Sequence, residues 1–351
     1  MSPPHRDNAL AALLQPFSDG VLHWPQAGKA LFLRARDGIG MRAASGCDVA
    51  CTQPFRPEAL RLARSGCDLI EEEALPEAAF PLVLALPPRQ RDEARALLAK
   101  ACAAVAPMGC IVVAVANDEG AKSREADLKQ LAGSVAALGK HHCRTFWTRP
   151  NAMFDKALVA QWRQLDAPRR IASDDVPGGG FLSRPGVFAW DRVDAASRML
   201  SAALPDDLHG RVADFGAGWG YLSMQALARC PRIASLDLYE ADARALALAR
   251  QNLAGARVPV ACHWHDVEQG VPDRFDAIVC NPPFHALGRG ERPDIGRAFI
   301  AAAAVTLTPG GRFWLVANRH LPYEDALGAG FTRTRIVVQD GGFKIVEAVK
   351  A

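Results

Sequence analysis

Residues 211–230 read RVADFGAGWGYLSMQALARC, which is a short apolar stretch, a glycine-rich turn and then a helical pattern. Gly216, Gly218 and Gly220 allow a sharp turn and a close approach to a ligand, because glycine has no Cβ. The spacing does not match the G-x-G-x-x-G pattern of dinucleotide-binding folds. It is Asp-x-Gly-x-Gly-x-Gly instead, and it places Asp214 at the end of the predicted strand. A carboxylate there suits a positively charged group, such as an ammonium, better than a pyrophosphate.

The next strand-like stretch, RIASLDLYE (232–240), ends in a second acid. Glu240 lies about 20 residues after the glycine turn, where an acid at the end of a second strand holds a ribose diol. Asp237 is the competing residue. We prefer Glu240 because its position aligns with the face that the following helix is expected to bury: Leu246, Ala249 and Asn252.

A third acid, Asp266, closes the stretch VPVACHWHD (258–266). Its carboxylate is able to accept a hydrogen bond from an adenine amino group. Any one of these acids has an alternative reading as a helix cap or a solvated loop charge. Three acids at three successive strand ends beside a glycine turn predict one binding site.

Residues 275–285, FDAIVCNPPFH, form an apolar strand that stops at Asn281. Pro282 and Pro283 cannot donate to a ladder of backbone hydrogen bonds, but they keep their carbonyl groups. With Phe284 beside them, they predict a rigid ledge that is rich in acceptors and has a flat apolar face. A flat ligand that donates hydrogen bonds fits such a ledge.

The first half of the chain contains a degenerate copy of these features. FPLVLALPPRQ (80–90) aligns with 275–285 without a gap, with Leu86 in the place of Asn281 and Arg89 in the place of Phe284. Downstream, 99–117 and 301–318 both read as an Ala-rich helix, a turn and a strand that ends in Val-Ala-Asn. Such a repeat indicates duplication. The stretch 30–40 has no Asp-x-Gly-x-Gly-x-Gly pattern, so we expect no cofactor binding in the first half.

The length of 351 residues favours two domains. Both halves alternate short β-type stretches with helical ones, which predicts parallel α/β sheets on both sides. Residues 172–186 are rich in Gly, Pro and Asp, and we interpret them as a linker. The predicted domains are therefore a degenerate one over 1–170, a linker over 171–185 and a catalytic one over 186–351.

The net charge of +3 is too small to indicate a nucleic-acid binder by itself. Residues 1–170 contain 22 basic and 18 acidic residues, a net charge of +4, whereas 171–351 carry −1. The nine cysteines include no C-x-x-C pair, so a metal site at Cys47, Cys51 and Cys67 is not favoured. We expect no metal, no membrane span, no secretory signal and a cytoplasmic location.

The second half resembles the class I S-adenosylmethionine-dependent methyltransferases. The resemblance is closest to the family that methylates the exocyclic N2 of guanine in small-subunit (16S) ribosomal RNA. It is carried by FLSRPGVFAWDRVDAASRML, VADFGAGWG, FDAIVCNPPFH, GGRFWLVANRHLPY and GGFKIVEAVK. It implies an α/β fold of two tandem Rossmann-like methyltransferase domains, the N-terminal one degenerate. Trp219 is a bulky residue inside the glycine turn, which differs from the pattern of the family. It is expected to narrow the methionine pocket.

The resemblance also implies roles for individual residues. The base amine would rest on Asn281 and the Pro282 carbonyl, next to Pro283, and Phe284 would stack on the base; His285 is adjacent, but a role as a general base is not favoured. S-adenosylmethionine would be bound by this set: Asp214, Gly216, Gly218, Gly220, Glu240, Asp266 and Asn281. The candidates for contact with substrate or RNA are Arg89, Arg91, Arg184, Asp194, His285 and Lys344.

Other interpretations remain open at this point. An adenine N6, a cytosine N4 or a protein glutamine amide would also fit an Asn-Pro-Pro ledge, and a non-catalytic RNA-binding assembly protein is the alternative from another class. The expected partner is ribosomal RNA in a small-subunit particle or its precursor, and the expected state is a monomer or a weak oligomer. The first half, with its surplus of positive charge, would dock RNA, with Arg144 and Arg149 as further contacts, or support the fold.

Overall fold

The computed structural model describes residues 7–38, 46–283 and 293–351. The chain divides into two compact units, Met1–Ala167 and Pro168–Ala351. The expected linker over 171–185 is wrong. These residues include most of a β-hairpin of the second unit, in which β8 (Arg169–Ala172) pairs with β9 (Gly180–Ser183). The Gly and Asp residues that suggested a linker belong mainly to the loop between these two strands.

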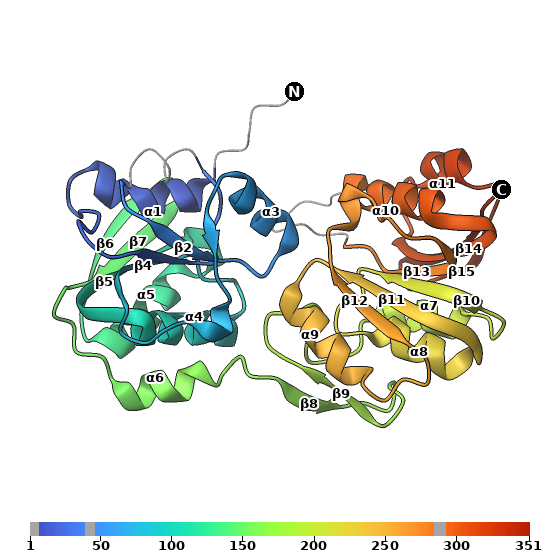
Figure 1. The fold of residues 1–351 in the computed structure, drawn as a ribbon, viewed down its shortest axis with the longest axis horizontal. Coiled ribbons are helices and arrows are strands. Elements are labelled where there is room, and N and C mark those ends of the chain that lie inside the picture. Colours follow the sequence, from blue (N-terminus) through green and yellow to red (C-terminus); the bar gives the residue numbers. More distant parts are fainter. Residues whose placement is uncertain (1–6, 39–45, 284–292) are drawn as a thin grey trace. The chain divides into compact units, whose positions relative to one another are not determined.

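The first unit contains a seven-stranded sheet (Figure 1). Its elements are, in order, α1 (Asn8–Ser18), β1 (Ala30–Leu33), β2 (Val49–Thr52), α3 (Arg56–Arg64), β3 (Asp68–Leu69), η1 (Glu72–Ala74), β4 (Phe80–Ala85), α4 (Arg91–Ala104), β5 (Val105–Ala116), η2 (Asn117–Glu119), α5 (Ala121–Ala132), β6 (Val135–Lys140), β7 (Cys143–Thr148) and α6 (Lys156–Arg163).

The second unit contains a sheet of the same size. After the β8–β9 hairpin its elements are α7 (Ala195–Ala203), β10 (His209–Phe215), α8 (Tyr221–Arg229), β11 (Arg232–Glu240), α9 (Ala243–Asn252), β12 (Val260–Trp264), η3 (Val267–Gln269), β13 (Phe275–Cys280), α10 (Pro293–Thr306), β14 (Leu307–Asn318), α11 (Glu324–Gly330), β15 (Arg333–Asp340) and β16 (Phe343–Val349).

The two sheets have the same strand order. It is β3-β2-β1-β4-β5-β7-β6 in the first unit and β12-β11-β10-β13-β14-β16-β15 in the second. The identical order supports the duplication that the repeat predicted. The sheets are mixed rather than parallel, because β7 and β16 run antiparallel to their neighbours. The expectation of purely parallel sheets was therefore wrong for the last hairpin of each unit.

A two-residue loop closes each of these hairpins. Gly341 and Gly342 join β15 to β16 with φ of 55° and 86°, and His141 and His142 join β6 to β7 with φ of 55° and 57°. Two successive residues with positive φ match the right-handed twist of hairpin strands. The Gly-Gly pair is a sequence signal from which the antiparallel hairpin could have been predicted.

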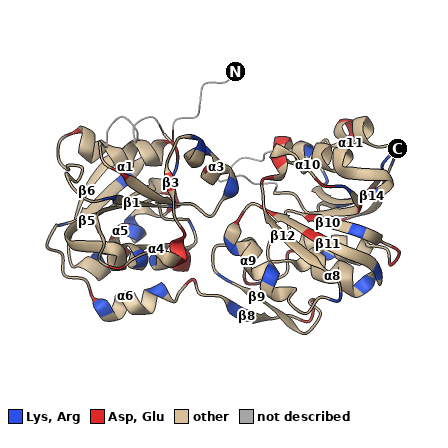
Figure 2. Ribbon diagram, viewed as in Figure 1, with Lys and Arg blue, Asp and Glu red and all other residues tan. Residues whose placement is uncertain are grey.

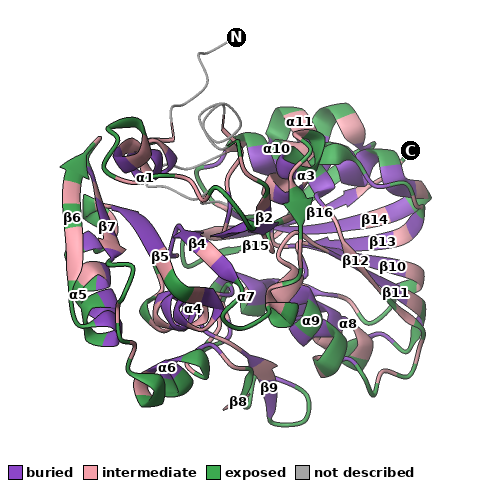
Figure 3. Cartoon of the chain, turned by 60° about the vertical axis from the view of Figure 1, so that its left-hand side comes forward, coloured by how far each residue is buried: buried purple, intermediate pink, exposed green. Residues whose placement is uncertain are grey.

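The core of the second unit lies on both faces of its sheet. Alternate residues of β10 face opposite sides: Val212 belongs to the cluster that includes residues of α7, α8 and α9, whereas Ala213 and Phe215 belong to the cluster that includes residues of α10 and α11. Figure 3 shows β10, β13 and β14 buried along most of their length. Asp214 is a fully buried carboxylate at the end of β10. Within the described residues, no helix is long and apolar enough to cross a membrane.

Candidate active site

The glycine turn lies between β10 and α8, as the sequence predicted. Gly216, Gly218 and Gly220 have φ of 78°, 56° and 96°, a region of backbone conformation that other residues adopt at a cost. The Tyr239 carbonyl, near the end of β11, accepts hydrogen bonds from the Gly216 N–H at 2.9 Å and the Ala217 N–H at 3.2 Å. The turn is therefore fastened to the neighbouring strand.

Asp214 lies near the end of β10, two residues before Gly216. Its Oδ2 accepts a hydrogen bond from Ser223 Oγ at 2.7 Å. Its Oδ1 is buried and has no hydrogen-bond partner among the described residues. Burial raises the pKa of Asp214 to about 7, and the nearby negative charge of Glu240 adds to this effect. A buried acceptor without a partner is costly, and a cationic ligand would remove that cost.

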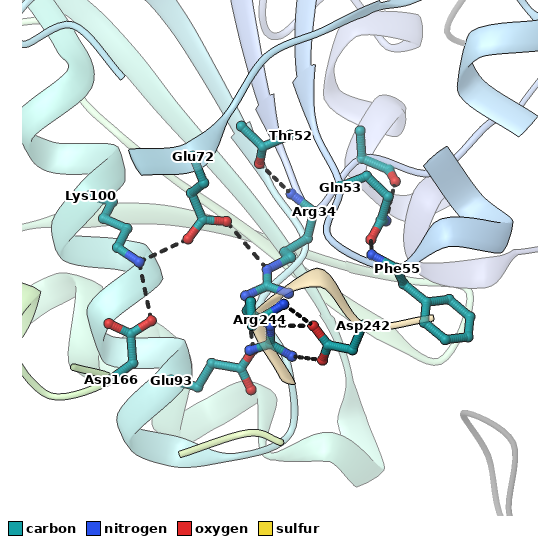
Figure 4. Close-up of polar contacts among 11 residues, drawn as sticks. Arg34, Thr52, Gln53, Phe55, Glu72, Glu93, Lys100, Asp166, Asp242 and Arg244 are labelled. Carbon is teal, nitrogen blue, oxygen red and sulfur yellow. Dashed lines mark hydrogen bonds and ion pairs between the residues drawn. The ribbon is translucent and has the colours of Figure 1, made fainter. Parts of the chain in front are cut away.

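Glu240 is the last residue of β11 and reaches the same turn. Its carboxylate accepts hydrogen bonds from the Gly218 N–H and from the Asp242 N–H, both at 2.7 Å. Burial raises the pKa of Glu240 to about 7. Asp242 caps α9, and the Arg244 guanidinium donates hydrogen bonds of 3.0 and 2.6 Å to its carboxylate (Figure 4). Arg244 thus offsets the negative charge next to Glu240.

Asp237, the competing acid, is occupied within the sheet. Arg211 donates two hydrogen bonds of 2.9 Å to it, and His263 Nε2 lies 2.9 Å from its Oδ1. Glu240 therefore contacts the glycine turn, whereas Asp237 is held by Arg211. Asp266 caps η3 by accepting from the Glu268 N–H at 3.1 Å, and it lies two residues beyond the end of β12.

Asn281 begins the predicted ledge, directly after β13. Its Nδ2 donates to Asp194 Oδ2 at 3.0 Å and to Ser197 Oγ at 2.8 Å. Pro282 is buried and Pro283 is exposed. The remaining ledge residues that the sequence singled out, Phe284 and His285, lie outside the described residues.

The ledge and the glycine turn are adjacent because β10 and β13 are parallel neighbours, with Phe215 opposite Cys280. A Cβ added to Gly216 would lie 3.7 Å from the Asn281 carbonyl oxygen. The structure therefore brings together the turn, the acids at the strand ends and the ledge at one edge of the sheet. This arrangement is able to hold an adenosine-like cationic ligand beside an acceptor for an amine.

Two neighbouring residues act in ways that the sequence did not reveal. Asn252 was expected on an apolar helix face, but its amide donates to the carbonyls of Trp219 at 2.8 Å and Leu182 at 3.0 Å, and so ties the glycine turn to β9. Trp219 was expected to narrow the methionine pocket. Its ring instead stacks on Phe181 in the core, with ring centroids 3.8 Å apart.

The candidates for RNA contact belong to both units. Arg89 and Arg91 lie in the first unit with side chains 53% and 59% exposed. In the second unit Asp194 contacts Asn281, and Arg184 is partly buried. Lys344 is buried and donates to the Leu321 carbonyl and to Glu324. The positive charge of Lys344 is therefore paired with Glu324 within the second unit.

The first unit has an ion cluster at the equivalent edge of its sheet. Arg34 follows β1 with φ of 56°, at the position that Gly216 occupies after β10. Its guanidinium lies 2.9 Å from Glu93 and 3.6 Å from Glu72, and both carboxylates are largely buried (Figure 4). Lys100 joins the cluster by pairing with Glu72 and with Asp166. The glycine turn and its acids are thus replaced by a cluster of paired charges.

Known proteins are similar to this chain in sequence. Residues 178–347 match the family described as "Methyltransferase small domain". The chain is 33% identical over 244 residues to ribosomal RNA small subunit methyltransferase C of Sodalis glossinidius, covering 69% of this chain and 67% of the relative. The chain belongs to the ribosomal RNA small subunit methyltransferase C family. The family protein of Psychromonas ingrahamii is 27% identical over 274 residues, covering 78% of this chain and 77% of the relative.

A solved structure extends this likeness to the whole molecule. The T. thermophilus 16S rRNA N2 G1207 methyltransferase, in complex with AdoMet and guanosine, has a TM-score of 0.83 and 25% sequence identity, and the match covers 99% of this chain and 93% of that one. The match therefore includes both units found here. The predicted α/β fold of two tandem methyltransferase-like domains is confirmed.

Proposed function

We propose that this protein transfers a methyl group from S-adenosylmethionine to the exocyclic N2 amine of a guanine in 16S ribosomal RNA. The observation that carries the proposal is the placement of Asn281 and Pro282 beside a glycine turn flanked by Asp214 and Glu240. The family's name gives methylation of small-subunit ribosomal RNA, and the T. thermophilus relative is an N2 methyltransferase in complex with guanosine. In that relative the target is G1207, so the corresponding guanine is the first position to examine.

The residues at the turn fit the cofactor. Asp214 Oδ1, which has no hydrogen-bond partner among the described residues, suits an ammonium group, and the Glu240 carboxylate suits a ribose diol. Asp266 suits an adenine amino group. The glycines allow the close approach of the ligand to the backbone. S-adenosylmethionine, when bound, supplies an electrophilic methyl group on a sulfonium.

The ledge then acts on the amine. The lone pair of an exocyclic amine is delocalised into the base, so the amine is a poor nucleophile. Acceptors at the Asn281 side chain and the Pro282 carbonyl would hold its two hydrogens and aim the lone pair at the methyl. As positive charge develops on the nitrogen, these fixed acceptors stabilise it. Most of the catalysis is therefore positioning, and acid–base chemistry contributes little.

A guanine within a duplex would not reach this ledge. We therefore propose a single-stranded or flipped nucleotide as the substrate. For the wider setting, we propose a small-subunit particle or its precursor as the substrate form, a cytoplasmic location and a monomeric or weakly oligomeric enzyme. The first unit would dock RNA and would bind no cofactor, since Arg34 and its carboxylate partners stand where the second unit has its glycine turn.

Analysis of the reaction product tests the proposal. The purified protein is incubated with S-adenosylmethionine and either naked 16S rRNA or small-subunit particles, and the nucleosides are identified by mass spectrometry. We expect N2-methylguanosine at one position, formed with one of the two substrates more rapidly than with the other. Methylation of adenine N6 or cytosine N4 would overturn the choice of guanine, and no methylation of either substrate would overturn the proposed activity.

A further inference from the structure

We propose that Asp194 and Ser197 are positioning residues that hold the Asn281 amide with its carbonyl oxygen available to the substrate amine. The inference rests on the proposed function, in which Asn281 accepts a hydrogen bond from that amine. It adds a second layer to the site: a carboxylate and a hydroxyl that act through Asn281.

The hydrogen bonds of the Asn281 amide carry the first step. An asparagine amide has two N–H donors and one carbonyl acceptor. Here Nδ2 uses both donors, on Asp194 Oδ2 at 3.0 Å and on Ser197 Oγ at 2.8 Å. The side-chain oxygen is then the one polar group of the amide left to meet a donor from the substrate.

The chemistry of Asp194 fixes this orientation. An ionised carboxylate only accepts hydrogen bonds. Turning the amide over would place its carbonyl oxygen against the Asp194 oxygen, and two acceptors would repel each other. The orientation that suits an amine substrate is therefore the one that Asp194 enforces, without any contribution from the substrate.

The position of Asp194 is itself fixed. Asp194 is the N-cap of α7, and the same Oδ2 accepts from the Ser197 N–H at 2.8 Å. Ser197, which is buried, lies in the first turn of this helix. The start of α7 therefore presents both partners of Asn281 as one rigid unit, and this preorganisation makes the amide an effective acceptor.

The charge of Asp194 adds to the effect. A carboxylate next to the amide N–H groups polarises the amide and makes its oxygen a stronger acceptor. That oxygen faces the nitrogen on which positive charge grows. Asp194 thus assists the transition state through Asn281, and it does not have to touch the substrate.

Two substitutions separate this role from helix capping. Serine and asparagine are both good N-caps, so Asp194→Ser and Asp194→Asn should both preserve α7. Asparagine keeps an oxygen that reaches Asn281, whereas the serine side chain is one bond shorter and leaves the amide held by Ser197 alone. We expect kcat to fall on the order of 10²-fold in Asp194→Ser and about 10-fold in Asp194→Asn, with the Kd for S-adenosylmethionine within about twofold of wild type.

Ser197→Ala removes one of the two acceptors and should lower kcat less than Asp194→Ser does. Each variant is measured as the full-length protein on the substrate that wild type methylates, with melting temperature and cofactor affinity by calorimetry as parallel readouts. Equal kcat in Asp194→Ser, Asp194→Asn and wild type would overturn the inference and leave Asp194 a cap only. Loss of cofactor affinity with normal kcat at saturation would also overturn it, because Asp194 would then be a cofactor contact.

The inference and the proposed function fail in different ways. If Asn281→Ala is inactive while Asp194→Ser is fully active, the ledge stands and the positioning role falls. If Asn281→Ala itself turns over normally, the proposed role of the ledge falls, and the inference falls with it.

Discussion

Glu240 and Asp237 lie three residues apart on β11, yet their surroundings differ. Glu240 accepts from the backbone of the glycine turn, and Asp237 is bound by Arg211 and His263. The sequence offered both as the acid that would hold a ribose, and only the contacts separate them. Spacing along a strand does not reveal which side chain an arginine on the neighbouring strand will pair with.

We predict that Glu240→Ala weakens cofactor binding by roughly 10- to 100-fold, because charge-assisted hydrogen bonds contribute about 1.5–3 kcal/mol. Asp237→Ala should leave the Kd nearly unchanged and lower the melting temperature instead, because it leaves Arg211 without its main partner. Calorimetry and thermal unfolding of both variants provide the comparison. A larger loss of affinity in Asp237→Ala would contradict the assignment.

The pKa values at the turn predict pH-dependent cofactor binding. Burial raises the pKa of both Asp214 and Glu240 to about 7, so protons occupy these carboxyls below that pH. A ligand with an ammonium and a diol favours the charged carboxylates. Affinity should therefore rise with pH up to about 7 and level off above it, by at most about tenfold per pH unit for each carboxyl that gives up a proton.

The effect of these two carboxyls on stability has the opposite sign. Between their ordinary pKa values, 3.8 and 4.5, and about 7, the native state holds more protons than the unfolded chain. Their contribution to the free energy of unfolding therefore falls as pH rises through this range.

The prediction for cofactor affinity is tested by calorimetric titrations at pH 6, 7 and 8 in buffers of different ionisation enthalpy, which should show proton release on cofactor binding. Equal affinity at all three pH values with no proton release would contradict the prediction.

The loop of the β15–β16 hairpin contains a glycine whose backbone conformation can be compared with that of a glycine in α11. Gly342 joins β15 to β16 at φ 86° with open space where a Cβ would lie, whereas Gly328 in α11 has open space and no positive φ. Open space removes steric clash as an explanation in both cases. The two glycines therefore form a matched pair that differs in backbone conformation.

We predict that Gly342→Ala lowers the free energy of unfolding by about 1–2 kcal/mol, because a side chain is strained in the left-handed region. Gly328→Ala should raise it by up to about 1 kcal/mol, because alanine is the better helix residue. Chemical denaturation measures both. Equal effects of the two substitutions would show that the conformation of the loop does not govern the stability of this hairpin.

Some elements were predictable from local patterns and others were not. The strand, glycine turn and helix over 211–230 follow from local patterns and appear as β10 and α8. The β8–β9 hairpin was mistaken for a linker because its strands have four residues each, which is too short for a clear alternation pattern. The contacts of Asn281 with Asp194 and Ser197 span more than 80 residues of sequence, and no local pattern reports such contacts.

At the scale of the whole molecule, the two units share a strand order and differ at the corresponding edge of the sheet. The second unit keeps the glycine turn and its acids, and the first has the Arg34 cluster there. The repeat in the sequence predicted the duplication, but not that buried charges would take the place of the turn. Basic residues of the first unit lie on α5 and α6, among other elements (Figure 2).

We predict that charge reversal at Arg89 and Arg91 weakens RNA binding by the full-length protein. The decrease of log K with log salt should also become less steep, by about 0.7–0.9 in slope for each phosphate that the protein no longer neutralises. Both side chains are more than half exposed, and each has an acid nearby, Glu119 at 3.8 Å and Asp127 at 3.5 Å. Binding is measured over a series of salt concentrations, with cofactor affinity as a test of folding.

The control is the same change of charge on α6, Lys156→Glu with Arg163→Glu. If the Arg89 and Arg91 variant binds RNA with wild-type affinity and salt slope, the docking role of these arginines is contradicted. If both double variants lose affinity equally, the effect follows net charge and not a defined contact surface.

The resemblance also names Asn281 among the cofactor contacts, whereas we propose that Asn281 acts on the substrate amine. Single-turnover kinetics of Asn281→Ala test this role most directly. With cofactor-saturated enzyme and the 16S rRNA substrate that wild type methylates, formation of N2-methylguanosine is followed by mass spectrometry. We predict a rate at least on the order of 10²-fold below wild type, with the calorimetric Kd for S-adenosylmethionine nearly unchanged. A near-normal rate of N2-methylguanosine formation in this variant would contradict the claim.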